Sequence, residues 1–216
     1  MDISVFPIFS GNVDAPVIYL PSDSASALQI YDLLPNPKPT LMILTDIDWN
    51  RDLSPWAAPA VFKNGGIFTG GAAAYLQRLL SALPSIEAGL SPIWRGIAGY
   101  SLAGLFAVWT MYQTDVFTRF ASLSGSLWFD GFTDYIKSNA AAVRPDYVYL
   151  SLGNREKQTR NPRMAAVETA TFETLHLLQS LSVPAEFKSE VGGHFDHPNN
   201  RIARGIAAIS LFRGSP

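Results

Sequence analysis

Short apolar runs alternate with helical patterns along most of the chain. Runs rich in β-branched and aromatic residues predict strands at 4–9, 16–20, 41–44, 93–98, 120–123, 147–152 and 185–189. Apolar residues at helical spacing predict helices at 24–33, 72–83, 102–109, 132–141, 164–181 and 202–211, with Ser24 as the cap of the first. Because parallel neighbours need crossover connections, this alternation implies an α/β fold with a mainly parallel central sheet and helices on both faces. Active groups are then expected at the carboxyl ends of the strands.

Residues 46–71 interrupt the alternation with a segment rich in tryptophan, proline and glycine. The segment is too long to serve only as a connection. The sequence shows no internal repeat, low-complexity tract or linker, and 216 residues with 48% hydrophobic content suffice for one large core. We therefore expect a single domain over residues 1–216.

The stretch Gly99-Tyr100-Ser101-Leu102-Ala103-Gly104 lies where an apolar run turns into a helical pattern. Such a turn forces the serine into a strained backbone conformation, which requires small residues two positions away, as Gly99 and Ala103 are. The hydroxyl then projects above the sheet, and the N–H of Leu102 at the new helix terminus faces any oxygen that approaches the serine. The stretch predicts a nucleophile elbow, with Ser101 as nucleophile and Leu102 as one oxyanion donor. A glycine-flanked serine also occurs in ordinary loops, so the assignment needs partner residues.

A serine nucleophile needs a base, and the chain offers three histidines. His176 lies in the middle of a predicted helix, which favours a packing or surface role. His194 follows the last predicted strand in a glycine-rich loop that allows close backbone approach, and it is the base we favour. His197 precedes Pro198 at the start of the last predicted helix, where a capping or solvent role is the better interpretation, although the base role stays open there.

The base in turn needs an acid that holds its tautomer. Glu156 is the first carboxylate after the strand at 147–152, and Asn154 cannot serve because an amide carries no charge. In the alternative, Glu156 is a solvated loop residue that pairs with a neighbouring cation. Asp196 is the reserve candidate, but its side chain would have to fold back along the histidine loop.

The composition excludes several classes of function. The net charge is −2, the pI is near 5.9 and the 16 basic residues are scattered, so no surface for nucleic acid is predicted. The absence of cysteine excludes disulfides, thiolate metal sites and cysteine nucleophiles. Neither a leader pattern nor an apolar stretch of membrane-spanning length is present, so we expect a cytoplasmic protein that does not contact a membrane. The sequence leaves the oligomeric state open, and a homodimer is one of the alternatives.

Several blocks along the chain occur together in one known family. They are Asp52–Trp56, Arg95–Phe106, Ser124–Trp128, Lys157–Pro162 and Gly193–Phe195. From about Pro16 onward the chain resembles a bacterial branch of the α/β-hydrolase esterases, related to the enterochelin esterase and esterase D group. The resemblance implies the α/β-hydrolase fold, with Ser101, His194 and Glu156 as the catalytic triad. The chain departs from the family pattern at Ala103, which replaces the usual glycine without steric harm, and at Asn154, where relatives often carry aspartate.

In that fold the second oxyanion donor comes from the loop after an early strand. Here the loop begins Pro21-Ser22-Asp23, and because proline has no N–H we expect Ser22 to be the donor. Asp48, Trp49 and Trp128 follow strand ends and are expected to contact substrate at the mouth of the site. Core packing is at least an equal alternative for each tryptophan.

The sequence thus predicts a serine hydrolase that cleaves a small-molecule carboxylic ester through an acyl-enzyme, without a cofactor or metal ion. An acyltransferase or a thioesterase would use the same residues. A catalytically silent binding protein on the same fold is the alternative from another class.

Overall fold

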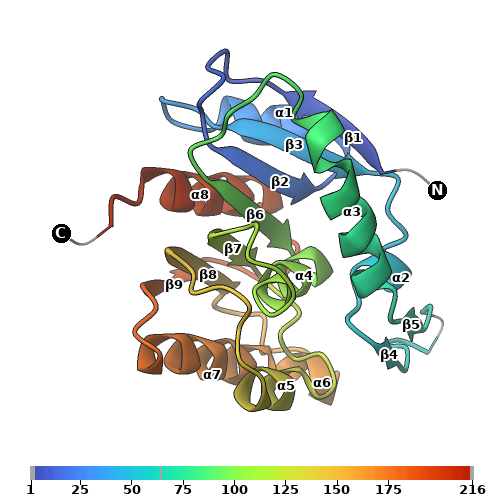
Figure 1. Cartoon of the computed structure of the whole chain (residues 1–216). Coiled ribbons are helices and arrows are strands. Elements are labelled where there is room, and N and C mark those ends of the chain that lie inside the picture. The colour runs from blue at the N-terminus through green and yellow to red at the C-terminus, as the bar shows by residue number, and fades with distance from the viewer. Residues whose placement is uncertain (1–2, 64, 215–216) are drawn as a thin grey trace.

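The computed structural model of the chain describes residues 3–63 and 65–214, and a seven-stranded sheet runs through its centre (Figure 1). The strand order is β1-β3-β2-β6-β7-β8-β9. Only β1 is antiparallel, with Ser4 opposite Thr45, and every other neighbouring pair is parallel. The strands are β1 (Ser4–Ile8), β2 (Val17–Pro21), β3 (Thr40–Thr45), β6 (Arg95–Tyr100), β7 (Arg119–Leu123), β8 (Tyr147–Gly153) and β9 (Ala185–Glu190).

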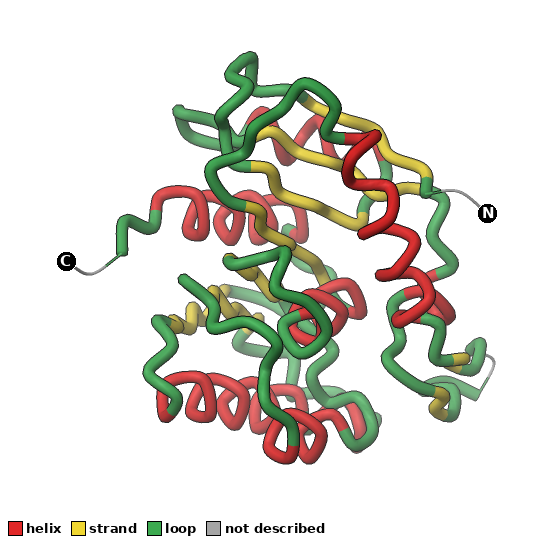
Figure 2. The backbone as a smooth tube through the Cα atoms, in the orientation of Figure 1, coloured by secondary structure: helices red, strands yellow, loops and turns green. Residues whose placement is uncertain are grey.

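Helices cover both faces of the sheet, as the alternating pattern predicts (Figures 1 and 2). Side chains alternate across β2: Tyr19 belongs to one core cluster, whereas Ile18 and Leu20 belong to the other. The second cluster is packed by α1 (Ser24–Asp32) and α8 (Pro198–Leu211). The first is packed by α3 (Ala72–Ile86), α4 (Leu102–Thr110), α5 (Phe132–Ser138) and α7 (Val167–Ser180).

Three helix boundaries differ from the sequence prediction for local reasons. The cap of α1 is Asp23 and not Ser24, because the Asp23 carboxylate accepts a hydrogen bond from the Ser26 N–H at 2.8 Å. The helix predicted at 164–181 is two helices, α6 (Pro162–Ala165) and α7, which meet at Ala166. The last helix begins at Pro198, four residues before the expected start, because proline suits the first position of a helix.

The long segment at 46–71 is folded and anchored. It contains α2 (Trp49–Asp52) and the short hairpin β4 (Ala57–Ala58) and β5 (Phe68–Thr69). The Ser54 hydroxyl ties its two ends, donating to the Asn50 carbonyl at 2.7 Å and accepting from the Gly70 N–H at 2.9 Å. The described residues of the segment, 46–63 and 65–71, therefore form a wall beside the carboxyl ends of the strands.

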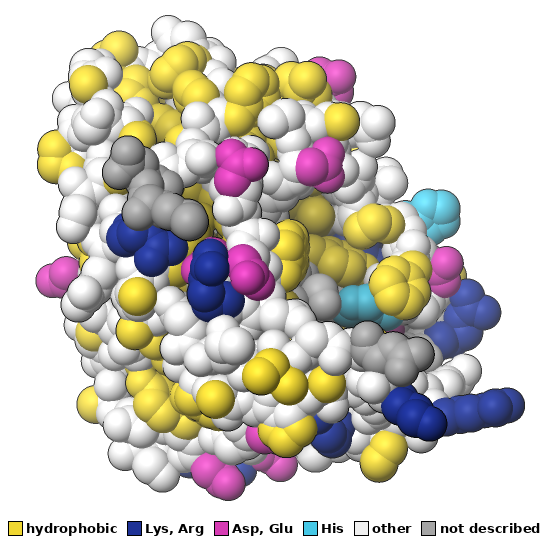
Figure 3. Space-filling model, turned by 90° about the vertical axis from the view of Figure 1, so that its right-hand side faces the viewer, with side chains coloured by type: hydrophobic (Ala, Val, Ile, Leu, Met, Phe, Trp, Pro, Cys, Tyr) yellow, Lys and Arg dark blue, Asp and Glu magenta, His cyan; other side chains and the backbone are white. Residues whose placement is uncertain are grey.

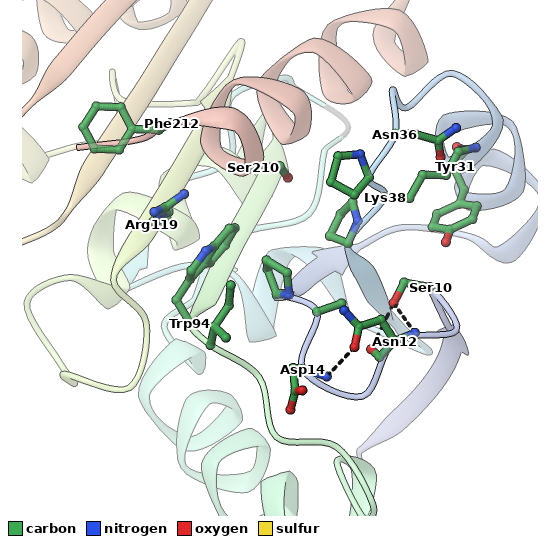
Figure 4. Close-up of a pocket in the computed structure, with 15 residues that line it drawn as sticks. Ser10, Asn12, Asp14, Tyr31, Asn36, Lys38, Trp94, Arg119, Ser210 and Phe212 are labelled. Carbon is green, nitrogen blue, oxygen red and sulfur yellow. Dashed lines mark hydrogen bonds between the residues drawn. The ribbon is translucent and has the colours of Figure 1, made fainter. Parts of the chain in front are cut away.

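A cavity of about 750 Å³ lies at the opposite, amino-terminal edge of the sheet (Figure 4). Several of its lining residues precede or begin strands; Trp94 comes just before β6 and Arg119 begins β7. The Arg119 guanidinium lies 4.2 Å from the centre of the Trp94 ring. Because parallel sheets gather their reactive groups at the other edge, this cavity is set apart from the candidate chemistry. In the described part of the chain, no helix combines the length and apolarity needed to cross a bilayer.

Candidate active site

Ser101 occupies a strained turn between β6 and α4. Its φ and ψ are 56° and −121°, a conformation that side chains rarely adopt outside such turns. The turn brings Gly99 so close to the next helical turn that a Cβ at this position would clash with the Ala103 carbonyl oxygen. Ala103 itself is fully buried and fits. The backbone thus presents the Ser101 hydroxyl at the carboxyl edge of the sheet, as the sequence motif predicts.

Three side chains form one hydrogen-bonded line at this edge. The Nε2 atom of His194 lies 3.1 Å from Ser101 Oγ, and its Nδ1 atom lies 2.8 Å from Glu156 Oε2. His194 comes from the loop after β9, and Glu156 from the turn after β8. The His194 side chain is 21% exposed, whereas that of Glu156 is 3% exposed. The imidazole therefore bridges a buried carboxylate and a hydroxyl that opens to the groove.

Glu156 is held as a carboxylate by the groups around it. Its Oε1 atom accepts from the Ser124 hydroxyl at 2.7 Å and from the Gly153 N–H at 2.7 Å, while Oε2 faces His194. Burial alone would raise the pKa of Glu156, but the hydrogen bonds from His194, Ser124 and Gly153 outweigh it and keep the pKa below its ordinary value. A charged acid next to the imidazole favours the Nδ1–H tautomer and leaves Nε2 free to accept a proton.

Arg201, on α8, is a site residue that the sequence analysis missed. Its side chain is 1% exposed, and Nη1 lies 2.9 Å from Glu156 Oε1. Nη2 donates to the carbonyl oxygens of Val191 and Gly193, at 3.1 and 2.9 Å. One guanidinium thus holds the acid and the loop that carries His194. The sequence did carry a signal for a buried Arg201, because this residue falls on the same face of α8 as the buried Gly205 and Ile209.

The other predicted partners lie elsewhere. His176 is exposed on α7, and His197 is exposed at the cap of α8. The Asp196 carboxylate accepts from the Gly193 N–H at 2.7 Å and from Arg155 at 3.1 Å, so it stabilises its own loop. The Asn154 side chain also stabilises the histidine loop, because its Oδ1 atom accepts from the Gly192 N–H at 3.1 Å. Among residues 3–63 and 65–214, no group of three or more histidine, aspartate or glutamate side chains is arranged to hold a metal ion.

Of the two residues expected as oxyanion donors, Leu102 lies directly after Ser101, and its donor role stays a prediction. As the first residue of α4, its N–H has no partner within the helix, and Leu102 lines the groove at Ser101. The expectation for Ser22 is wrong, because its N–H continues the sheet and donates to the Leu44 carbonyl at 3.2 Å. A hydroxyl that the sequence analysis did not single out lies nearby instead: Ser126 Oγ is 3.4 Å from Ser101 Oγ.

A groove of about 390 Å³ opens over Ser101, and Figure 3 shows the hollow bordered by hydrophobic side chains. Trp49 and Trp128 line it, as expected. Asp48 is not among its lining residues, and its carboxylate caps α2 by accepting from the Arg51 N–H at 3.2 Å. The lining residues are Trp49, Asn50, Val61, Phe62, Gly65, Gly66, Phe68, Ser101, Leu102, Ser126, Trp128, Met164, His194 and Phe195.

No protein-family model matches the chain, and no curated protein matches it. Solved structures do. The siderophore hydrolase EstA from Aspergillus nidulans superposes with a TM-score of 0.71 at 19% identity, over 91% of this chain and 82% of that one. The chain of residues 1–216 therefore has an α/β-hydrolase fold. The enterochelin esterase from Shigella flexneri gives a TM-score of 0.69 at 18% identity, over 97% of this chain but 55% of that one. The enterobactin and salmochelin hydrolase IroE gives 0.65 at 17% identity, over 97% and 95%.

Proposed function

We propose that this protein is a serine hydrolase that cleaves carboxylic esters through an acyl-enzyme, with Ser101, His194 and Glu156 as its triad. One observation carries the proposal: a continuous hydrogen-bonded line joins these three side chains and ends at the floor of an open groove. A buried ion pair or a capping residue would not need a strained serine at a strand-to-helix turn.

In the first half of the reaction, His194 Nε2 takes the proton of Ser101 Oγ while Oγ attacks the ester carbonyl carbon. The carbonyl oxygen becomes an oxyanion, and the Leu102 N–H donates a hydrogen bond to it. The carbon–oxygen bond to the alcohol then breaks, and protonated His194 returns its proton to the leaving oxygen. Ser101 now carries the acyl group.

In the second half, water replaces the alcohol. His194 takes a proton from water, the resulting hydroxide attacks the acyl carbon, and the bond to Ser101 Oγ breaks as His194 returns the proton to Oγ. Glu156 stays ionised throughout and stabilises the imidazolium that forms in each half. The low pKa of Glu156 supports this role, because a carboxyl that ionises readily keeps its negative charge beside the ring.

The structural neighbours support the ester as the class of bond. Those neighbours are siderophore hydrolases and esterases, and they share this fold at 17–19% identity. At that identity the fold is the shared property, so we extend to this protein only the type of bond and not the siderophore.

The test is covalent labelling with a fluorophosphonate, read by intact mass. Wild type should gain one adduct, and Ser101→Ala should gain none while its kcat falls by about 10⁴-fold or more. Ser22→Ala is the matched control and should label like wild type, because Ser22 is not among the residues that line the groove. An adduct that persists on Ser101→Ala would refute the nucleophile assignment. A wild-type protein that never labels would indicate a binding protein.

A further inference from the structure

The groove over Ser101 is lined by side chains without charge. Eight of the fourteen lining residues carry large apolar side chains, among them Trp49, Phe62 and Trp128. Its polar side chains are Asn50, Ser101, Ser126 and His194. The Asn50 amide is already engaged, donating to the Gly66 carbonyl at 3.1 Å. Apart from the groups of the reaction itself, the groove therefore offers substrate an apolar surface.

Cations on the elements around the groove are absent from its lining. Arg163 lies behind Trp128, with its guanidinium 5.7 Å from the centre of that ring, and it donates to Asp130 and to the Pro59 carbonyl. Lys157 is paired with Glu168 at 2.7 Å. Lys63 is on the segment that forms one wall, but it is not among the residues that line the groove. An anionic group in the groove would thus lose its hydration without gaining a countercharge.

The apolar surface continues onto the rim. Phe62 is 62% exposed on the wall segment, and Phe195 is 87% exposed on the histidine loop. Large aromatic side chains that stay exposed on both sides of one groove form a contiguous apolar patch, which is typical of a binding site.

Building on the proposed function, we propose that the groove selects neutral esters with an alkyl or aryl acyl group and discriminates against acyl groups that carry a carboxylate. The leaving oxygen must face His194 Nε2, next to Phe195, to receive its proton. We place the acyl group away from Phe195, beside the wall segment, which contributes Trp49, Phe62 and Phe68 to the lining of the groove.

The first test is a series of 4-nitrophenyl esters at constant pH. From acetate to hexanoate, kcat/KM should rise by roughly fourfold per methylene, the gain expected when a CH₂ group leaves water for an apolar surface. The half-ester of adipic acid, similar in length to hexanoate but anionic, should react about tenfold or more slowly than hexanoate. A half-ester that reacts as fast as hexanoate would overturn the proposal.

The second test adds a cation at the rim. Phe62→Lys should raise the kcat/KM ratio of adipate half-ester to hexanoate by about tenfold, because the half-ester gains a countercharge. Phe9→Lys is the matched control, since Phe9 is also an exposed aromatic residue, 56% exposed, just beyond edge strand β1. It should leave the ratio unchanged. An unchanged ratio in Phe62→Lys would overturn the placement of the acyl group.

A binding measurement separates this proposal from the proposed function. Ser101→Ala should bind 4-nitrophenyl hexanoate more tightly than the adipate half-ester in calorimetry, whether or not the wild type hydrolyses either. Selective binding without hydrolysis by wild type would contradict the function and leave the groove assignment standing. Hydrolysis of both esters at equal rates would contradict the groove assignment and leave the function standing.

Discussion

Arg201 carries a full positive charge into a site where its side chain is 1% exposed. Such a charge is stable only if it is paired and its hydrogens are bonded, and here Glu156, Ser124 and two loop carbonyls fulfil both conditions. Glu156 therefore has two partners: the His194 imidazole contacts Oε2, and the Arg201 guanidinium contacts Oε1. Its removal should affect folding as well as the reaction.

We predict that Glu156→Gln lowers kcat by about 10²- to 10⁴-fold and also destabilises the fold by about 3 kcal/mol. The destabilisation follows because Arg201 stays buried without its carboxylate. Adding Arg201→Met should cost about 2 kcal/mol less than the sum of the single changes, because the double variant buries no unpaired charge. Urea denaturation of the four proteins measures this coupling. Additive effects would show that Arg201 and Glu156 do not stabilise each other.

We also predict that Asp196→Asn changes kcat by less than about threefold, in contrast to Glu156→Gln. The Asp196 carboxylate contacts the Gly193 N–H and Arg155 but not the imidazole. Steady-state kinetics of the two variants, with circular dichroism to confirm folding, makes the comparison. If Asp196→Asn loses as much kcat as Glu156→Gln, the acid role of Glu156 has to be revised.

At the scale of single residues, the sequence indicated some contacts and not others. The elbow at Ser101 was predictable because small residues two positions from a serine have a local steric cause. Ser22 was mistaken for a donor because the sequence does not show that β2 and β3 pair far enough to engage its N–H. Asp48 was assigned to substrate for a similar reason, since the short helix that it caps could not be read from the pattern.

At the scale of elements, the wall of the groove is held from outside the triad. Helix α6 is only one turn long, yet it bonds the wall segment at two places: Asn161 donates to the Val61 carbonyl at 2.8 Å, and Arg163 donates to the Pro59 and Ala60 carbonyls at 3.0 and 3.2 Å. The length of residues 46–71 indicated a functional segment. The contacts that anchor the segment come from residues about a hundred positions later in the chain, so they could not be predicted from the sequence pattern.

Loosening this contact should weaken substrate binding more than the chemical step. We predict that Arg163→Met raises KM for a hexanoyl ester by about tenfold and changes kcat by less than about threefold, because the triad lies on other elements. Lys137→Met is the matched control, since it removes an exposed ion pair with Glu173 away from the groove. An unchanged KM in Arg163→Met would show that the wall keeps its position without α6.

At the scale of the whole molecule, the site is assembled by the register of four neighbouring parallel strands. The ends of β6, β7, β8 and β9 place Ser101, Ser124, Glu156 and His194 at one edge, although up to 93 positions separate the paired atoms in the chain. The order of strands and helices was predictable, because each element has its own periodicity. The break between α6 and α7 was not, because it depends on the side chain of Asn161, which caps α6 as a separate turn. The start of α8 at Pro198 was missed although proline suits the first position of a helix.

The last prediction concerns the stability of the whole molecule in acid. Burial would raise the pKa of Glu156, but its hydrogen bonds outweigh that and depress the pKa below its ordinary 4.5. Between the depressed and the ordinary value, the unfolded chain binds more protons at this residue than the folded chain. The free energy of unfolding therefore rises with pH across this window, its full contribution is present above about pH 4.5, and it is lost as pH falls.

Urea denaturation at a series of pH values from about 3 to 6 tests this assignment. Wild type should lose stability steeply toward the acid end, and Glu156→Gln, which cannot titrate at this position, should show a shallower slope. Ser22→Ala keeps the carboxylate and should follow the wild-type slope. Parallel slopes for wild type and Glu156→Gln would mean that Glu156 ionises as easily in the unfolded chain as in the fold. The buried carboxylate beside His194 would then not be held in its charged form by the fold, and the basis for its role as the acid would be lost.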